Sequence, residues 1–229
     1  MRRGFIANLP LALSVAAYGS ILGVLAAQKQ ISWVELLAMN VSIFAGAAQF
    51  VMVDMWAPPL PILEITLAVL AINIRYLLIG ASLQPIFDGK SRLHKFVMMH
   101  LVADENWAVT MAEYRKGTVS TYFLFGGGLC IFFAWCLGTL TGHRVGAVVQ
   151  NPEAYGLDFV FVAVFTALLT TLWRGKTDFA PWVIAAALAL LAHWVLPGRW
   201  YIVIGGIGGA VVPLFRPPTT ESRDGRQSS

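Results

Sequence analysis

Apolar runs of about twenty residues follow one another through most of this sequence, separated by short polar or proline-marked breaks. As a helix, such a run is long enough to cross a hydrocarbon layer about 30 Å thick. Hydrophobic residues make up 58% of the 229 residues and charged residues only 12%, which is more apolar surface than one soluble domain can bury. The runs lack the short alternation typical of barrel strands. We therefore predict an all-α, polytopic membrane helix bundle.

The runs predict about seven to eight spans, some of them broken or re-entrant. Their approximate positions are 5–27, 33–56, 62–83, 96–113, 122–140, 157–173, 179–195 and 200–215. The distribution of Lys and Arg between alternate loops favours seven crossings plus one re-entrant or broken segment over eight crossings. In this prediction residues 1–215 form a single transmembrane domain. Residues 216–229 are rich in Pro, Ser, Thr and charge and form a disordered tail.

Several functional classes are disfavoured by the composition and motifs. The net charge of +4 does not indicate a nucleic-acid partner, because no basic helix or aromatic-interleaved basic patch carries it. Cys130 and Cys136 lie in an apolar run and are interpreted as core thiols. His100 and Asp104 stand four residues apart, but two ligands are too few to indicate a metal site. Without a metal-binding helix motif, a serine elbow or a phosphate loop, we expect no enzyme activity, metal or cofactor.

The third run contains an arginine that needs a physical reason. Arg75 lies in an apolar stretch with Asn73 and Tyr76. A central arginine in a membrane span costs roughly 2.5–3.5 kcal/mol on insertion scales, so it faces the protein interior, a partner or a substrate. The fourth run holds Asp104 and Glu105 at its centre and cannot face lipid. It is either a helix surrounded by protein or a re-entrant segment that lines a cavity.

Further polar and small residues mark the first two runs. Pro10 either breaks the first helix or lies in its first turn. Tyr18 makes the same run unusually polar. Glu35, Ser42 and Gln49 recur every seven residues, which predicts one helical face, and Gln49 either packs between helices or contacts substrate. The glycines expected to permit close helix packing are Gly19, Gly23, Gly46, Gly205 and Gly209.

Four segments in this order resemble the AzlC family, the large subunits of bacterial branched-chain amino acid exporters. They are Gly46-Ala-Ala-Gln49, Ile72-Asn-Ile-Arg-Tyr-Leu-Leu-Ile-Gly-Ala-Ser-Leu83, Asp104-Glu105-x-Trp-Ala and Gly156-Leu-Asp-Phe159. The resemblance extends from about residue 4 to 213, and its most specific part is Asn-x-Arg. Many members carry histidine after that arginine, where this chain has Tyr76, so no histidine role carries over.

The resemblance implies export of hydrophobic amino acids, driven by an ion gradient, across the cytoplasmic (inner) membrane of a bacterium. It also implies a partner, a small AzlD-like membrane subunit. A zwitterionic substrate offers a carboxylate to Arg75 and an ammonium to an acid. The expected substrate-binding residues are Tyr18, Gln49, Asn73, Arg75 and Tyr76. The expected proton- or ion-coupling residues are Asp104 and Glu105.

Two alternatives stay open at this point. Arg75 could pair with Asp104 or Glu105 purely to hold spans together. The whole chain could be a scaffold or assembly subunit for a partner protein, with its glycine patches as the contact surfaces.

Overall fold

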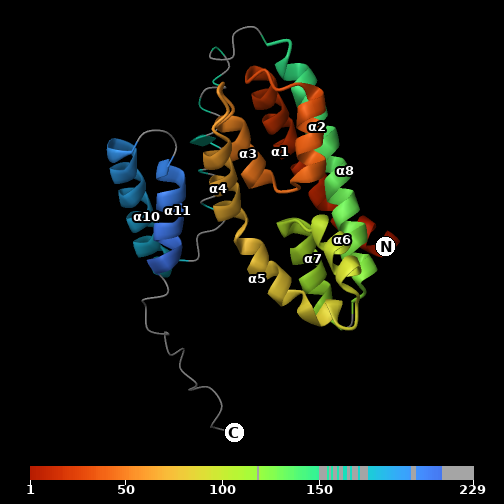
Figure 1. Cartoon of the computed structure of the whole chain (residues 1–229). Coiled ribbons are helices and arrows are strands. Elements are labelled where there is room, and N and C mark those ends of the chain that lie inside the picture. The colour runs from red at the N-terminus through yellow and green to blue at the C-terminus, as the bar shows by residue number, and fades with distance from the viewer. Residues whose placement is uncertain are drawn as a thin grey trace. The chain divides into compact units, whose positions relative to one another are not determined.

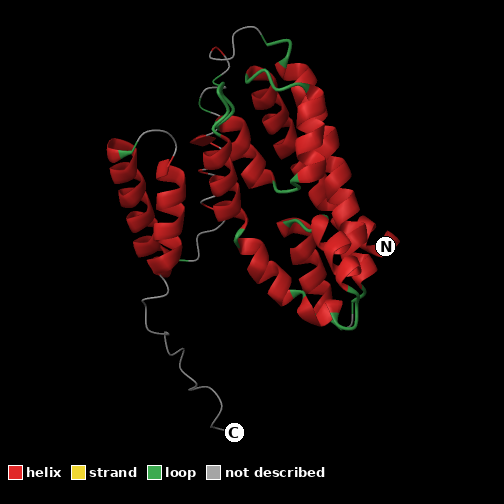
Figure 2. Ribbon diagram, viewed as in Figure 1, coloured by secondary structure: helices red, strands yellow, loops and turns green. Residues whose placement is uncertain are grey.

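The computed structural model describes most of the chain: residues 1–117, 119–149, 175–196, 200–212 and isolated positions between 154 and 170. Its regular elements in these ranges are helices, as predicted (Figure 2). The chain divides into two compact units, Met1–Leu168 and Leu169–Ser229, each considered by itself below. Most of the predicted run at 157–173 and all of the tail at 216–229 lie outside the described residues. The division into one transmembrane domain and a tail stays a prediction.

Among the described residues of the first unit, three stretches are long and apolar enough to cross a membrane. They are α1 (Arg2–Gln28), the consecutive helices α4 (Ile62–Asn73) and α5 (Arg75–Ser82), and α8 (Thr121–Gly146) (Figure 1). Helices α4 and α5 are separated at Ile74, between the Asn73 and Arg75 singled out in the sequence. A short 3₁₀ helix, η1 (Gln84–Phe87), follows α5.

The predicted span at 33–56 does not cross, which corrects the sequence-based expectation. It forms α2 (Trp33–Ser42) and α3 (Gly46–Asp54) with a turn between them. The Lys29 ammonium, just after α1, donates to the Asp54 carbonyl at 3.0 Å, so the end of α3 has returned to the level where α2 began. The seven-residue repeat was therefore interpreted wrongly, because the turn separates Ser42 from Gln49.

The fourth run forms a second hairpin, which enters from the opposite end. It consists of α6 (Arg92–His100) and α7 (Asp104–Tyr114). His94 near the start of α6 lies 3.2 Å from the Thr121 hydroxyl, and Glu113 near the end of α7 pairs with Arg3 at 3.3 Å. Both ends thus lie beside the beginnings of α8 and α1. The run therefore turns back on itself as a hairpin that lies beside α1 and α8, and its re-entrant placement in a membrane stays a prediction.

Each hairpin begins at a serine N-cap. The Ser32 hydroxyl accepts from the Glu35 N–H at 3.3 Å, and the Ser91 hydroxyl accepts from the His94 N–H at 3.3 Å. The Ser32 hydroxyl and N–H both donate to the Glu35 carboxylate at 2.7 Å. These two bonds stabilise the charged form and lower the pKa of Glu35.

Helices α1 and α8 pack closely and run parallel (Figure 1). Successive contacts pair Ala16 with Gly138, Ser20 with Gly142 and Val24 with Gly146. On the other side, Gly23 of α1 lies against the Thr139 carbonyl, and Gly19 lies against Trp135. This packing continues α8 to Gly146, beyond the predicted end at 140. His143 reaches the Ile31 carbonyl at 2.7 Å in the same extension.

Pro10 lies well inside α1, which continues past it as one helix, so Pro10 neither breaks the helix nor lies in its first turn. In the second unit, α10 (Lys176–Val195) and α11 (Trp200–Val211) form an antiparallel pair. Gly205 faces Ala189 and Gly209 faces Ala185 across this pair.

Gly142→Val should weaken the α1–α8 interface, because its Cβ would collide with the Ser20 carbonyl. We expect a loss of about 1–3 kcal/mol of stability, which is typical of overpacking. Thermal unfolding of the purified protein in detergent measures it. Gly80→Ala is the matched control, since the nearest atom to its Cβ is the Met99 Cε at 3.8 Å. Equal unfolding temperatures for the two variants would contradict this packing.

Candidate functional site

The two hairpin tips and the α4–α5 break meet at one level of the first unit. His100 at the end of α6 lies 2.8 Å from the Val41 carbonyl of α2, which joins the tips. A cavity of about 80 Å³ lies at this junction. Its polar and small lining residues are Tyr18, Gly46, Arg75, Tyr76, Asp104 and Glu105. Five of the seven residues expected to bind substrate or couple ions are therefore brought together.

Three helices begin at this cavity. Gly46 opens α3, Arg75 opens α5 and Asp104 opens α7. The first N–H groups of a helix have no partner inside the helix and carry a partial positive charge. At α3 and α5 the residue before the helix makes no side-chain cap. Broken helices whose N-termini point into a cavity are typical of sites for anionic substrate groups in transporters.

Arg75 and Asp104 form an ion pair at the cavity. The Arg75 Nη1 lies 2.8 Å from the Asp104 Oδ2, and their side chains are 33% and 45% exposed. The guanidinium carbon also lies 5.6 Å from the centre of the Tyr76 ring, within the range of a cation–π contact. Arg75 thus meets one of the two acids expected from the sequence, while a second donor, its Nε, is still available.

Three buried polar atoms at the junction have no hydrogen-bond partner among the residues that the structure describes. They are the Tyr18 Oη, the Asn73 Oδ1 and the Arg75 Nε. An unsatisfied buried donor or acceptor costs about 1–3 kcal/mol, so each favours a polar ligand. Tyr18 packs against Phe50, with ring centres 4.8 Å apart, and against Trp135 at 6.0 Å, both in tilted ring contacts.

Gln49 is fully buried and engaged by protein groups. Its Nε2 donates to the carbonyls of Ile43 at 2.6 Å and Met39 at 3.3 Å, and its Oε1 accepts from the Trp135 indole at 2.8 Å. The side chain therefore closes the end of α2 across the hairpin turn. This arrangement is the packing alternative that the sequence left open for Gln49.

Asn106 does the same for the second hairpin, and sequence reasoning missed its role. Its Oδ1 accepts from the Ala103 N–H at 2.7 Å, and its Nδ2 donates to the carbonyls of Leu101 and Leu124 at 3.1 Å. Its position three residues after Ala103, the N-cap of α7, was the available signal. Trp135 was also missed, because a tryptophan in an apolar run has no distinguishing sequence pattern.

A second cavity of about 310 Å³ lies beside the first. The two share Phe44 and Tyr76 in their walls. Asn73, expected to bind substrate, lines this second cavity and not the first, and His100 lies at its edge.

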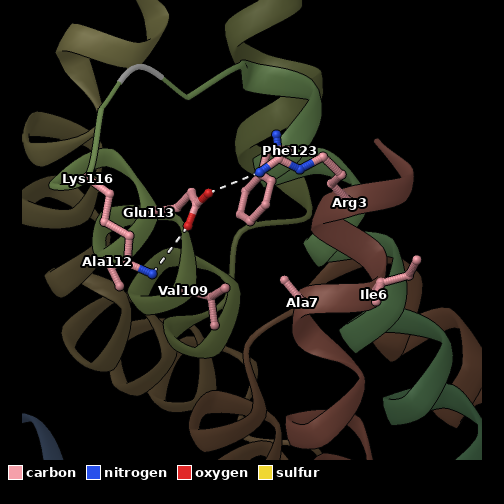
Figure 3. A pocket seen from close by; sticks show the side chains of 8 residues that line it. All are labelled: Arg3, Ile6, Ala7, Val109, Ala112, Glu113, Lys116 and Phe123. Atoms are coloured by element: carbon pink, nitrogen blue, oxygen red, sulfur yellow. Dashed lines mark hydrogen bonds and ion pairs between the residues drawn. The ribbon is translucent and has the colours of Figure 1, made fainter.

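A third cavity, of about 500 Å³, lies near the chain start, between α1, α7 and α8. Figure 3 shows Glu113 at its wall between Arg3 and Lys116, at 3.3 and 3.5 Å. The Arg3 side chain is 85% exposed, and exposed ion pairs contribute only about 0–1 kcal/mol. Both cations are mostly exposed and share one carboxylate, so this cavity is a weaker candidate than the junction.

Comparison with known proteins finds one family and several membrane proteins that are similar to this chain. The family described as "AzlC protein" matches residues 10–149. A Helicobacter pylori (strain J99) "Uncharacterized membrane protein" is 26% identical and covers 81% of each chain. The Bacillus subtilis "Branched-chain amino acid transport protein AzlC" is 22% identical over 94% of this chain and 85% of its own length. The Escherichia coli "Inner membrane protein YgaZ" is 26% identical over 87% and 83%. No solved structure matches.

Gln49→Leu should destabilise the protein, because it removes the side-chain hydrogen bonds that join α3 to the end of α2 and to Trp135. The Trp135 indole keeps its bond to the Asn40 Oδ1 at 3.1 Å, and the Ile43 carbonyl keeps its bond from the Ala45 N–H at 2.8 Å. We expect a loss of about 0.5–1.5 kcal/mol for each hydrogen bond removed, measured by thermal unfolding in detergent. Thr66→Val is the control, since Thr66 is exposed and bonds only to its own helix. If Gln49→Leu kept full stability and lost only ligand binding, Gln49 would be a ligand contact.

Proposed function

This chain belongs to the AzlC family of membrane proteins, and we propose that it is the large subunit of a secondary transporter for branched-chain or other hydrophobic amino acids. It exports them across the cytoplasmic (inner) membrane of a bacterium with a small AzlD-like subunit as its partner. The observation that carries the proposal is the junction cavity, where three helix N-termini, Arg75 and two carboxylates meet in an apolar protein.

The cavity presents opposite charges suited to the head group of an amino acid. A carboxylate fits the N-terminus of α3 at Gly46, the Tyr18 hydroxyl and the Arg75 Nε, all of which offer donors. An ammonium fits Asp104 and Glu105, which offer acceptors. Each group that lacks a partner within the protein would gain one from the ligand, which supports binding of a zwitterion.

The Arg75–Asp104 pair is the element that responds to substrate. A substrate carboxylate competes with Asp104 for the guanidinium, and a substrate ammonium competes with Arg75 for the carboxylate. Binding therefore exchanges one ion pair for two, and α5, which carries Arg75, can then move relative to the second hairpin, which carries Asp104. Glu105, beside this pair in the same cavity, is the proposed site for the coupling proton.

Arg75→Gln should abolish export. Removing a charged hydrogen-bond partner costs about 1.5–3 kcal/mol, so substrate affinity falls by roughly 10- to 100-fold. The measurement is leucine efflux from cells that lack the native gene, are loaded with a leucine dipeptide, and express each variant at an equal level. Wild-type cells should lower internal leucine, and Arg75→Gln cells should accumulate it.

A double variant separates a substrate role from a structural one. Arg75→Gln with Asp104→Asn removes both charges and leaves no unpaired ion. If the pair only holds helices together, this double variant regains efflux; if Arg75 binds substrate, efflux stays lost. Arg3→Gln with Glu113→Gln neutralises the exposed pair and should retain efflux, because exposed pairs contribute little. Normal efflux in Arg75→Gln would refute the proposed site.

Glu105→Gln should uncouple transport. Without a proton carrier, net leucine movement driven by a pH gradient should fall at least about tenfold, while exchange of labelled for unlabelled leucine persists. Proteoliposomes containing the chain and its partner subunit allow both measurements. Glu113→Gln, a carboxylate at the far end of the same helix, is the control. Unchanged gradient-driven transport in Glu105→Gln would exclude Glu105 as the coupling group.

A further inference from the structure

The junction cavity is too small for a whole hydrophobic amino acid. Its volume of about 80 Å³ corresponds to roughly two or three water molecules, at about 30 Å³ each in the liquid. That space suits a carboxylate and an ammonium on one carbon. A branched side chain must then lie elsewhere.

The second cavity provides that space directly beside the first. Its volume of about 310 Å³ reaches the usual range of small-ligand pockets, about 300–1,000 Å³. Phe44 of the first hairpin turn and Tyr76 of α5 belong to the walls of both cavities. A ligand held by its head group at Arg75 can therefore extend its side chain past these two rings into the second cavity.

The walls of the second cavity are largely hydrocarbon. Val69 of α4, Met99 of α6, and Val102 and Ala45 at the hairpin turns contribute apolar side chains. Val102 and Ala45 are buried, while Val69 and Met99 are partly buried. Asn73 adds its buried Oδ1 on the side where α4 ends at the junction, and Ser42 and His100 add further polar groups. Largely apolar walls with a few polar groups are typical of small-ligand pockets, and they fit an aliphatic chain whose head group lies at the junction.

We propose that this second cavity is the side-chain subsite, and that Val69 and Met99 set the size of the aliphatic side chain it takes. The inference rests on the proposed function, because it assumes that the head group binds at the junction. Val69 lies on α4 and Met99 on α6. A substitution at either position alters the second cavity and leaves Arg75, Asp104 and Glu105, which do not line it, in place.

Val69→Phe and Met99→Ala test the subsite in opposite directions. Calorimetric titration of the purified complex of the full-length protein and its partner subunit with leucine, isoleucine, alanine and phenylalanine gives each affinity. Val69→Phe fills the cavity, so leucine and isoleucine should weaken by about 10- to 100-fold while alanine stays within about twofold. Met99→Ala enlarges the cavity, so phenylalanine should gain about tenfold relative to leucine. Leu70→Phe is the matched control, next to Val69 but 61% exposed, and should change nothing.

Each result decides the inference. Selective loss of leucine in Val69→Phe, or selective gain of phenylalanine in Met99→Ala, supports the subsite. Equal weakening of leucine and alanine, unchanged selectivity in both variants, or the same shift in Leu70→Phe overturns it while leaving the proposed function intact. If Val69→Phe does not fold, Met99→Ala alone decides. Failure of the wild-type protein to bind any of the four amino acids overturns both proposals.

Discussion

A helix that ends inside an apolar protein must satisfy the backbone groups it releases, and this requirement organises the first unit. At the hairpin turns, carbonyl groups at the ends of α2 and α6 receive side-chain amides, from Gln49 and from Asn106. The beginnings of α3 and α5 have no side-chain cap and open at the cavity. The Gln49 and Asn106 side chains therefore neutralise the negative C-terminal ends of α2 and α6. The positive N-terminal ends of α3 and α5 remain at the junction cavity.

This asymmetry explains why an arginine at the junction needs an acid. Arg75 opens α5, where the helix dipole disfavours a cation, and it lies near the open beginning of α3. Asp104 opens α7, where the same dipole favours an anion. Their 2.8 Å contact offsets the unfavourable placement of the arginine. A ligand that replaces Asp104 at Arg75 must therefore bring its own negative charge, which links the helix geometry to the class of substrate.

The helical class and most of the junction residues were predictable from the sequence, because charged residues, which are costly to place in lipid, stand out in an apolar run. Arg75, Asp104 and Glu105 could not face lipid, and the re-entrant alternative for the fourth run followed from that cost. The turn in the run at 33–56 was missed. An apolar stretch with one glutamine has the same hydropathy whether it forms one spanning helix or a hairpin of two short helices. Asn73 was assigned to the right neighbourhood, but only the fold shows that it lines the second cavity.

The sequence by itself determined that this chain is a helical membrane protein with charged residues inside two of its apolar runs, because hydropathy and the cost of charge in lipid depend on residue type alone. The tertiary structure decided which helices turn back and which ends are capped. Those outcomes depend on contacts between distant residues, such as Gln49 with Trp135 and Asn106 with Leu124. A polar side chain becomes a structural cap or a ligand group only when the fold supplies or withholds its partner.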